Sequence, residues 1–515
     1  MNKNISLVLI FLSLLSFGQV EEKKLDELIQ NTLKTFDVPG MSVGIVKDGK
    51  IVYAKGFGVN SLAARNNMDE NTLVGIASNS KGFTGTALAI LADEGKLNWD
   101  DKVTKYIPEF QMYDPYVTQE VTIKDLVTHR AGLGLGQGDL MFFPEGGNLT
   151  VNDIVHNVRY LKPENPFRTT LDYNNIMFIV AGEVIHRVSG LSWAEFIEKK
   201  IMKPVGMNAS FGSYSRAKRA GVTNIIDAHA PVDGKAVMVP HDWNETANAA
   251  GGIMSNIKDM MTWAEFLMNG FTTKDGKKLV SDKQIQQLWN LQVSTPVALK
   301  NTYDSNFGGY GLGWFVTDVK GHKQVYHTGG LIGTVTQFTL IPDMKLGIIV
   351  LTNQQSGAAF NTITNTVKDS YLGVTDRNWL KTYGDRMTKY NTDVDKGKKE
   401  IFEKSTAFAK NKNQQIKPEQ IVGTYHDLWF GDVTISHDGK TYRIVCKNSP
   451  RLKGELLPYT PNVMIAKWDD RSYDADAFVN FSLDENGKAQ SAKMKPISDI
   501  TDFSFDFEDL DLKKK

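Results

Sequence analysis

The chain has 515 residues, a formal net charge of zero and a single cysteine. This length is ample for two or three domains with sizeable hydrophobic cores. The balanced charge gives no reason to expect nucleic acid or an acidic polymer as a partner, and one cysteine excludes an internal disulfide.

The first 18 residues have the pattern of a secretory signal peptide. Lys3 supplies a positive charge, an apolar stretch follows at 5–17, and small residues precede a predicted cleavage site at Gln19. The apolar stretch is too short to span a bilayer, and no other segment is long and apolar enough. We therefore expect a secreted or periplasmic protein with no membrane span.

The segments that follow alternate between strand and helix patterns in three blocks. An amphipathic helix at 22–36 precedes two strands that meet at a predicted hairpin turn, Asp48-Gly49. Helical patterns dominate from 78 to about 269. Strands return at 312–318, 324–326, 334–341 and 346–352, before a helix at 359–372. This order predicts an antiparallel sheet completed by both ends of the domain, with a large helical subdomain inserted.

A serine and a lysine, Ser78 and Lys81, stand at the start of the first helical segment of the middle block. Because the two residues are three positions apart in the first turn of a helix, the Lys81 amine comes within reach of the Ser78 hydroxyl. The helix N-terminus also favours a developing oxyanion. The pair therefore predicts a nucleophile with its base. The same spacing at Ser215 and Ser255 lacks this context, and Ser255 is interpreted as the N-cap of a helix that begins at Ile257.

Tyr173 and Asn175 directly precede an apolar helix predicted at 176–188. The Tyr173 phenol could share a proton with Lys81, and the Asn175 amide could bind either Lys81 or a substrate carbonyl. Capping of the helix by one of residues 172–175 fits the same sequence and does not exclude the catalytic role.

A later motif, His327-Thr328-Gly329-Gly330, follows a short predicted strand. The two glycines let the backbone approach a ligand closely, and an N–H group here would complete an oxyanion hole with that of Ser78. His327 is the first residue expected to change activity between pH 5 and 8.

These three motifs in this order resemble the penicillin-recognising serine hydrolases, the group of class C β-lactamases, D-Ala-D-Ala carboxypeptidases, D-aminopeptidases and β-lactamase-like esterases. The resemblance covers about residues 22–375. It implies an α+β fold in which helices flank an antiparallel sheet and a large helical subdomain is inserted.

The resemblance also implies residue roles. Ser78 would be acylated, Lys81 and Tyr173 would exchange its proton, and the N–H groups of Ser78 and Gly330 would form the oxyanion hole. Substrate binding would fall to Asn175, His327, Thr328, Gly329 and Gly330. Class C β-lactamases usually have lysine where this chain has His327. That difference favours a peptidase, amidase or esterase.

Beyond the hydrolase-like part, expected at 19–375, the composition changes. Residues 376–415 are predicted as a partly helical linker, and 416–515 as short strands that form a small antiparallel barrel. The barrel resembles the lipocalin-like domains often appended to this group. Within it, the acidic stretch 502–511 alternates Phe with Asp, Ser and Glu and predicts a last strand with one solvated face. Cys446 is expected to be buried.

The sequence therefore predicts a secreted serine hydrolase that cleaves an amide or ester bond through a Ser78 acyl-enzyme. The substrate would be a small-molecule or peptide acyl compound, with no metal or other cofactor. Two alternatives stay open: a β-lactamase, and a non-catalytic binding or sensing protein on the same scaffold. The C-terminal domain could form a homo-oligomer or narrow access to the cleft.

Overall fold

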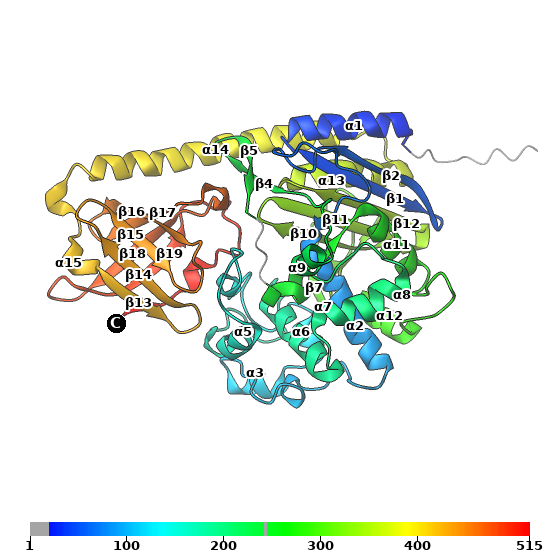
Figure 1. Cartoon of the computed structure of the whole chain (residues 1–515), viewed down its shortest axis with the longest axis horizontal. Coiled ribbons are helices and arrows are strands. Elements are labelled where there is room, and N and C mark those ends of the chain that lie inside the picture. The colour runs from blue at the N-terminus through cyan, green and yellow to red at the C-terminus, as the bar shows by residue number, and fades with distance from the viewer. Residues whose placement is uncertain (1–19, 241–244) are drawn as a thin grey trace, which may run out of the picture.

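The computed structural model describes residues 20–240 and 245–515, which form a sheet-and-helix domain, a long helix and a C-terminal barrel (Figure 1). The signal peptide predicted at 1–18 lies outside the described residues. The long helix, α14 (Trp379–Phe408), has 30 residues and runs from the sheet domain to the barrel. Most of the expected linker is therefore one continuous helix.

The sheet has eight antiparallel strands in the order β2-β1-β12-β11-β10-β9-β8-β7. In chain order these are β1 (Gly40–Lys47), β2 (Lys50–Gly58), β7 (Val293–Thr295), β8 (Gly308–Tyr310), β9 (Phe315–Val319), β10 (His322–Leu331), β11 (Thr334–Ile341) and β12 (Leu346–Thr352). The first strands thus lie beside the last one, which confirms the predicted sheet. The bounds of β10 correct one expectation, because residues 327–330 lie within this strand and not after it.

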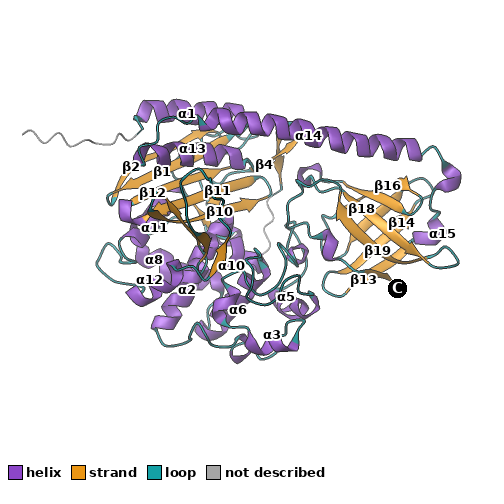
Figure 2. Cartoon of the chain, turned by 180° about the vertical axis from the view of Figure 1, so that it is seen from behind, coloured by secondary structure: helices purple, strands orange, loops and turns teal. Residues whose placement is uncertain are grey.

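Helices cover both faces of the sheet, and the central strand β12 is buried along its whole length. All seven residues of β12 are buried, and residues 348–351 alternate between two separate hydrophobic cores. One core lies under α1 (Glu22–Thr35) and α13 (Gly357–Tyr371), and the other lies under α11 (Ile257–Met268) (Figure 2).

The helical subdomain is inserted between β2 and β7. Its elements are β3 (Val74–Gly75), the 3₁₀ turn η1 (Ala77–Asn79), α2 (Ser80–Asp93), α3 (Pro115–Glu120), α4 (Ile123–Leu126), α5 (Val151–Asn157), α6 (Ile176–Ser189), α7 (Trp193–Ile197), α8 (Lys203–Val205), α9 (Tyr214–Arg219), β4 (Ala228–Val232), β5 (Lys235–Val239), α10 (Asn248–Gly251), β6 (Met254–Ser255) and α12 (Asp282–Trp289). Asn256, and not Ser255, caps α11, since its side chain accepts a hydrogen bond from Asp259 N. In the described part of the chain no single helix is long and apolar enough to cross a bilayer.

The C-terminal strands close into a barrel, as the sequence predicts. These strands are β13 (Gly423–Asp427), β14 (Gly431–His437), β15 (Tyr442–Cys446), β16 (Lys453–Thr460), β17 (Val463–Trp468), β18 (Ala477–Leu483), β19 (Ala489–Pro496) and β20 (Leu512–Lys514), preceded by α15 (Pro418–Ile421). Large apolar side chains, among them Tyr425 and Trp468, are buried inside the barrel, and so is Cys446. The strand predicted at 502–511 is wrong: only β20, which pairs with β13 and β19, closes the barrel there.

Candidate active site

Ser78 lies in the η1 turn, immediately before α2 and beside β10. Ala77 has a φ of 50°, a left-handed value that a residue with a β-carbon adopts only under local constraint. Two contacts supply that constraint. Asn79 Nδ2 donates to Thr336 Oγ1 at 2.8 Å, and Thr336 Oγ1 donates to Ile76 O at 2.9 Å. The turn is thereby fixed to β11 and presents Ser78 to the cavity.

Lys81 is fully buried one turn further along, and its amine lies 3.0 Å from Ser78 Oγ. The same amine donates to Asn175 Oδ1 at 2.7 Å and to Ala250 O at 2.9 Å. Burial lowers the pKa of Lys81 to about 7, although the charge of Asp139 opposes the decrease. A neutral amine donates two hydrogens and keeps one lone pair. With Asn175 and Ala250 as acceptors, the lone pair faces Ser78, as a general base requires.

Asn175 joins Lys81 to a carboxylate that sequence reasoning missed. Its Oδ1 accepts from Lys81, and its Nδ2 donates to Asp139 Oδ2 at 2.7 Å. Of the two roles considered for this amide, the structure holds the contact with Lys81. Helix capping is done by the neighbouring Asn174, whose Oδ1 accepts from Met177 N at 3.2 Å.

Tyr173 lines the same cavity as Ser78. The Lys81 amine is 4.9 Å from the centre of the Tyr173 ring, close enough for a cation–π contact when Lys81 is charged. Burial raises the pKa of Tyr173 well above that of free tyrosine. Its phenol therefore keeps its proton at neutral pH and can donate it, whereas the Lys81 amine, with its lowered pKa, can accept one.

His327 is buried in β10 and uses both ring nitrogens. Its Nδ1 lies 2.6 Å from Thr328 O and carries the hydrogen, so its Nε2 accepts from the Tyr310 hydroxyl at 2.9 Å. Burial lowers the pKa of His327 to about 3, and the nearby Lys81 adds to the decrease. His327 is therefore neutral across pH 5 to 8, which makes the expectation that it titrates there wrong.

The glycines of the motif face different surroundings. A β-carbon on Gly329 would lie 2.2 Å from Ile76 O, so only glycine allows β10 to approach the start of the η1 turn this closely. Nothing lies within 4 Å of a β-carbon built on Gly330, which is exposed beside the cavity. Thr328 also lines the cavity.

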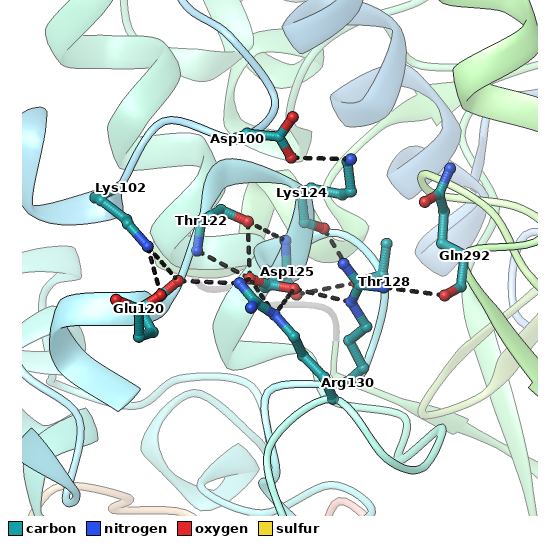
Figure 3. A network of polar contacts seen from close by, with 10 residues as sticks. Asp100, Lys102, Glu120, Thr122, Lys124, Asp125, Thr128, Arg130 and Gln292 are labelled. Carbon is teal, nitrogen blue, oxygen red and sulfur yellow. Dashed lines mark hydrogen bonds and ion pairs between the residues drawn. The ribbon is translucent and has the colours of Figure 1, made fainter. Parts of the chain in front are cut away.

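A buried acidic side chain, Asp125, lies at the centre of a network of polar contacts (Figure 3). Asp125 accepts hydrogen bonds from Thr122 Oγ1 at 2.7 Å and Arg130 Nε at 2.8 Å, and Arg168 contributes a further ion pair at 2.6 Å. Burial alone would raise the pKa of Asp125, but these partners, Arg168 foremost, lower it. The ion pairs join the loop that contains Arg130 to the loop that leads to Tyr173.

His129 is buried and supports the Tyr173 loop. Its Nδ1 accepts from Asn174 N at 3.0 Å, and its ring centre lies 4.2 Å from that of Tyr173. The glycine-rich segment next to it also contacts this loop, since Gly136 N donates to Tyr173 O at 2.9 Å.

A cavity of about 500 Å³ opens in front of Ser78. Its aromatic and aliphatic lining includes Leu135, Phe142, Phe143, Phe315, Leu331, Ile332, Val335, Phe360, Tyr473, Phe503 and Phe505. Among the described residues that line it, none is Lys or Arg, and the one acidic side chain is Asp502. The cavity is therefore suited to neutral, apolar groups.

Part of this cavity wall comes from the C-terminal barrel. Residues 502–505 join the hydrolase-like residues in lining it, and the Phe503 ring lies 5.9 Å from that of Tyr173. Ser504 Oγ donates to Asp139 Oδ2 at 2.7 Å. The alternation of Phe with polar residues at 502–511 was visible in the sequence, but it predicted a strand and gave no sign of this contact with the cavity.

A family model described as "Beta-lactamase" matches residues 25–372, and one for a domain of unknown function, DUF3471, matches 409–514. An "Unguisins hydrolase ungD'" of Aspergillus campestris is 28% identical over 351 residues, 65% of this chain and 62% of that protein. "Protein flp" of Staphylococcus aureus is 27% identical over 343 residues, 65% of this chain and 64% of that protein. The match thus spans less than two thirds of either relative.

Two solved structures share the fold. The octameric penicillin-binding protein homologue from Pyrococcus abyssi superposes with a TM-score of 0.60 at 23% identity, covering 93% of this chain and 98% of that one. A mutant of a class C beta-lactamase superposes with a TM-score of 0.54 at 21% identity, covering 68% of this chain and 97% of that one.

Proposed function

The chain belongs to the beta-lactamase family, and on this premise we propose that it hydrolyses an amide or ester bond of a neutral, apolar acyl compound through a Ser78 acyl-enzyme. The single observation that carries this proposal is the buried Lys81 amine, whose nitrogen lies 3.0 Å from Ser78 Oγ. A merely structural lysine would not need this position.

In the proposed reaction, Ser78 Oγ attacks the carbonyl carbon and passes its proton to Lys81. The carbonyl oxygen becomes an oxyanion that the N–H groups of Ser78 and Gly330 stabilise. The bond to the leaving nitrogen or oxygen then breaks, and Tyr173 delivers the proton from Lys81 to that atom. Water attacks the acyl-enzyme with Lys81 again as base, which releases the acid and restores the Ser78 hydroxyl.

The charge of the site supports a neutral substrate. Penicillins and peptides that end in D-Ala carry a carboxylate, which a cation in the cleft would hold. Here His327 is neutral, and the cavity lining of the described residues contains no Lys or Arg. Desolvating a carboxylate beside Asp502 would be unfavourable, so β-lactam hydrolysis is the weaker alternative.

The bond-cleaving role is tested by mixing the protein with p-nitrophenyl butyrate and following both p-nitrophenolate release and intact mass. We expect turnover and a butyryl adduct that disappear in Ser78→Ala. Ser215→Ala is a matched control, because Ser215 has a lysine at the same spacing but lies on α9, outside the cavity. Turnover in Ser78→Ala equal to that of the unchanged protein would overturn the proposal.

The substrate class is tested with a matched pair of esters, p-nitrophenyl butyrate and the p-nitrophenyl monoester of succinate. They share the leaving group and differ by a carboxylate. We expect kcat/KM to be at least about tenfold higher for the butyrate, a difference of about 1.4 kcal/mol in transition-state stabilisation. Equal values would show that the cleft accepts a carboxylate.

We also propose that the protein is exported, from the pattern of residues 1–18, and that it forms a homo-oligomer through the barrel. The second point takes support from the octameric state named for the Pyrococcus abyssi relative. N-terminal sequencing of protein from the periplasm or medium tests the first, and a start at Met1 would contradict it. Light scattering tests the second, and a monomer would contradict it.

A further inference from the structure

The C-terminal barrel inserts a short segment, residues 502–506, into the edge of the hydrolase-like domain. Phe503 lies against Gly136, where a β-carbon would come within 2.6 Å of its ring. Gly136 has a φ of 70°, so two separate constraints favour glycine at this contact. Phe505 packs edge-on against Phe143, with ring centres 5.0 Å apart. The segment is therefore held by fitted contacts on both sides of Ser504.

Polar contacts continue the insertion into the interior. Asp506 accepts hydrogen bonds from Gly138 N and Leu140 N, which flank Asp139. Ser504, 7% exposed, donates its hydroxyl to Asp139 Oδ2 at 2.7 Å. Both residues of the barrel thus act on the same short stretch of the other domain, 138–140.

Asp139 transmits this contact to the base of the reaction. The same Oδ2 that accepts from Ser504 accepts from Asn175 Nδ2 at 2.7 Å, and Asn175 Oδ1 accepts from Lys81 at 2.7 Å. Asp139 is fully buried, and its Oδ1 has no hydrogen-bond partner among the described residues. Ser504 and Asn175 therefore fix the orientation of this carboxyl group between them.

We propose that Ser504 is a positioning residue, which acts through Asp139 and Asn175 on the amine of Lys81, so that the barrel completes the hydrolytic apparatus. This inference rests on the proposed function, because it assigns a role toward the Ser78 reaction. It goes beyond that function by making activity depend on a side chain from the second domain.

The charges of the chain of contacts determine the expected pH effect. Burial raises the pKa of Asp139 to about 7, Ser504 and Asn175 oppose that rise, and the charge of Lys81 opposes it further. Loss of the Ser504 hydroxyl would therefore protonate Asp139 more readily. A protonated Asp139 no longer stabilises the Lys81 ammonium, so the pKa of Lys81 would decrease.

Other titratable groups surround Asp139 and Lys81 and could also affect the pH dependence of the rate. They are His129 and His327 beside Lys81, Tyr173 and Tyr310 beside the histidines, and Asp502 and Asp506 beside Asp139. Burial lowers the pKa of both histidines and raises the pKa of both tyrosines, so these four stay neutral near pH 7.

The test uses the full chain and a fluorophosphonate, which reacts with an activated serine without needing the natural substrate. Ser78 Oγ forms a bond to phosphorus, fluoride leaves and Lys81 takes the proton. The rate is measured from pH 5 to 9 for the unchanged protein, Ser504→Ala, Ser504→Thr and Ser405→Ala. Ser405 is a matched control in α14, because its hydroxyl donates one bond, to Pro458 O of β16 at 2.8 Å, and its side chain does not line the cavity.

For Ser504→Ala we expect the plateau rate to fall about fivefold, the effect of one ordinary hydrogen bond, and the acid limb to shift to lower pH by about half a unit. Ser504→Thr keeps the hydroxyl and should restore both. Ser405→Ala should change neither. A Ser504→Ala profile that keeps its midpoint would overturn the proposal, whatever its plateau, since a purely structural contact predicts that result.

Failure of the two proposals would look different. If the unchanged protein forms no Ser78 adduct at any pH, the proposed function fails, and the role of Ser504 fails with it. If the unchanged protein reacts but Ser504→Ala reacts identically, the role of Ser504 alone is refuted. Should Ser504→Ala fold poorly by circular dichroism, Ser504→Cys, with its weaker donor, carries the same prediction with a smaller shift.

Discussion

The acid limb of the pH–rate profile distinguishes the two groups that could control activity below neutrality. Lys81 has a pKa of about 7 and must be neutral to accept the Ser78 proton, whereas His327 has a pKa of about 3. As the pH falls through 7, Lys81 becomes protonated and its lone pair is lost. His327 keeps one charge state over the same range. We therefore predict that activity decreases below pH 7 because Lys81, and not His327, becomes protonated.

The size of the decrease follows from the position of that pKa. With a midpoint at about 7, roughly one molecule in ten holds neutral Lys81 at pH 6 and one in a hundred at pH 5. The rate of p-nitrophenyl butyrate hydrolysis at low substrate concentration should therefore fall about tenfold per pH unit below 6.5. This slope is that of a single proton.

The matched variant is His327→Gln, which keeps a neutral side chain able to accept a hydrogen bond from Tyr310. We expect a lower plateau, since the fit is imperfect, but the same midpoint near pH 7. Circular dichroism at each pH excludes unfolding as the cause of the decrease. An acid limb that vanishes or moves by a unit or more in His327→Gln would refute the reasoning, because His327 would then be the titrating group.

Three further outcomes follow from contacts at the site. Lys81→Met, whose side chain is similar in length, should lower kcat at least about a thousandfold because it removes the base. Thermal stability should change little, because the substitution also removes a buried amine. A retained kcat would exclude Lys81 as base. Gly329→Ala should abolish activity and lower Tm, since its β-carbon would lie 2.2 Å from Ile76 O, whereas Gly330→Ala should fold with an unchanged Tm. The opposite order of Tm would contradict the close approach of β10. Asp125→Ala should lower the free energy of unfolding by about 3–5 kcal/mol in urea titrations, because Arg130 and Arg168 lose their shared partner. A loss below about 1 kcal/mol would contradict a stabilising role for Asp125.

Local spacing made part of the site predictable. Ser78 and Lys81 are three residues apart at the start of a helix, so their proximity follows from helix geometry alone. The strands at 334–341 and 346–352 were predicted with the bounds that the structure shows, because both are rich in β-branched residues and a turn at 342–345 separates them.

What the sequence did not reveal depends on distant contacts. Asp139 meets Ser504 across 365 positions of the chain, and no local pattern marks either as part of the site. The charge of His327 was equally inaccessible, since burial and the nearby charge of Lys81 lower its pKa and keep it neutral. The stretch 502–511 was predicted as a strand because alternation is the local signal, but tertiary contacts with residues 136–143 override it.

The helix α14 connects the two domains, so a change in its tilt would move the barrel relative to the sheet domain. With 30 residues it is about 45 Å long, so a tilt of about 10° at its base would carry the barrel about 8 Å sideways. Such a displacement exceeds the reach of any hydrogen bond. The alignment of the cleft therefore depends less on the stiffness of α14 than on the contacts of Phe503 and Asp506 with residues 136–140. If these contacts were weakened, each domain would stay folded but the cleft between them would open.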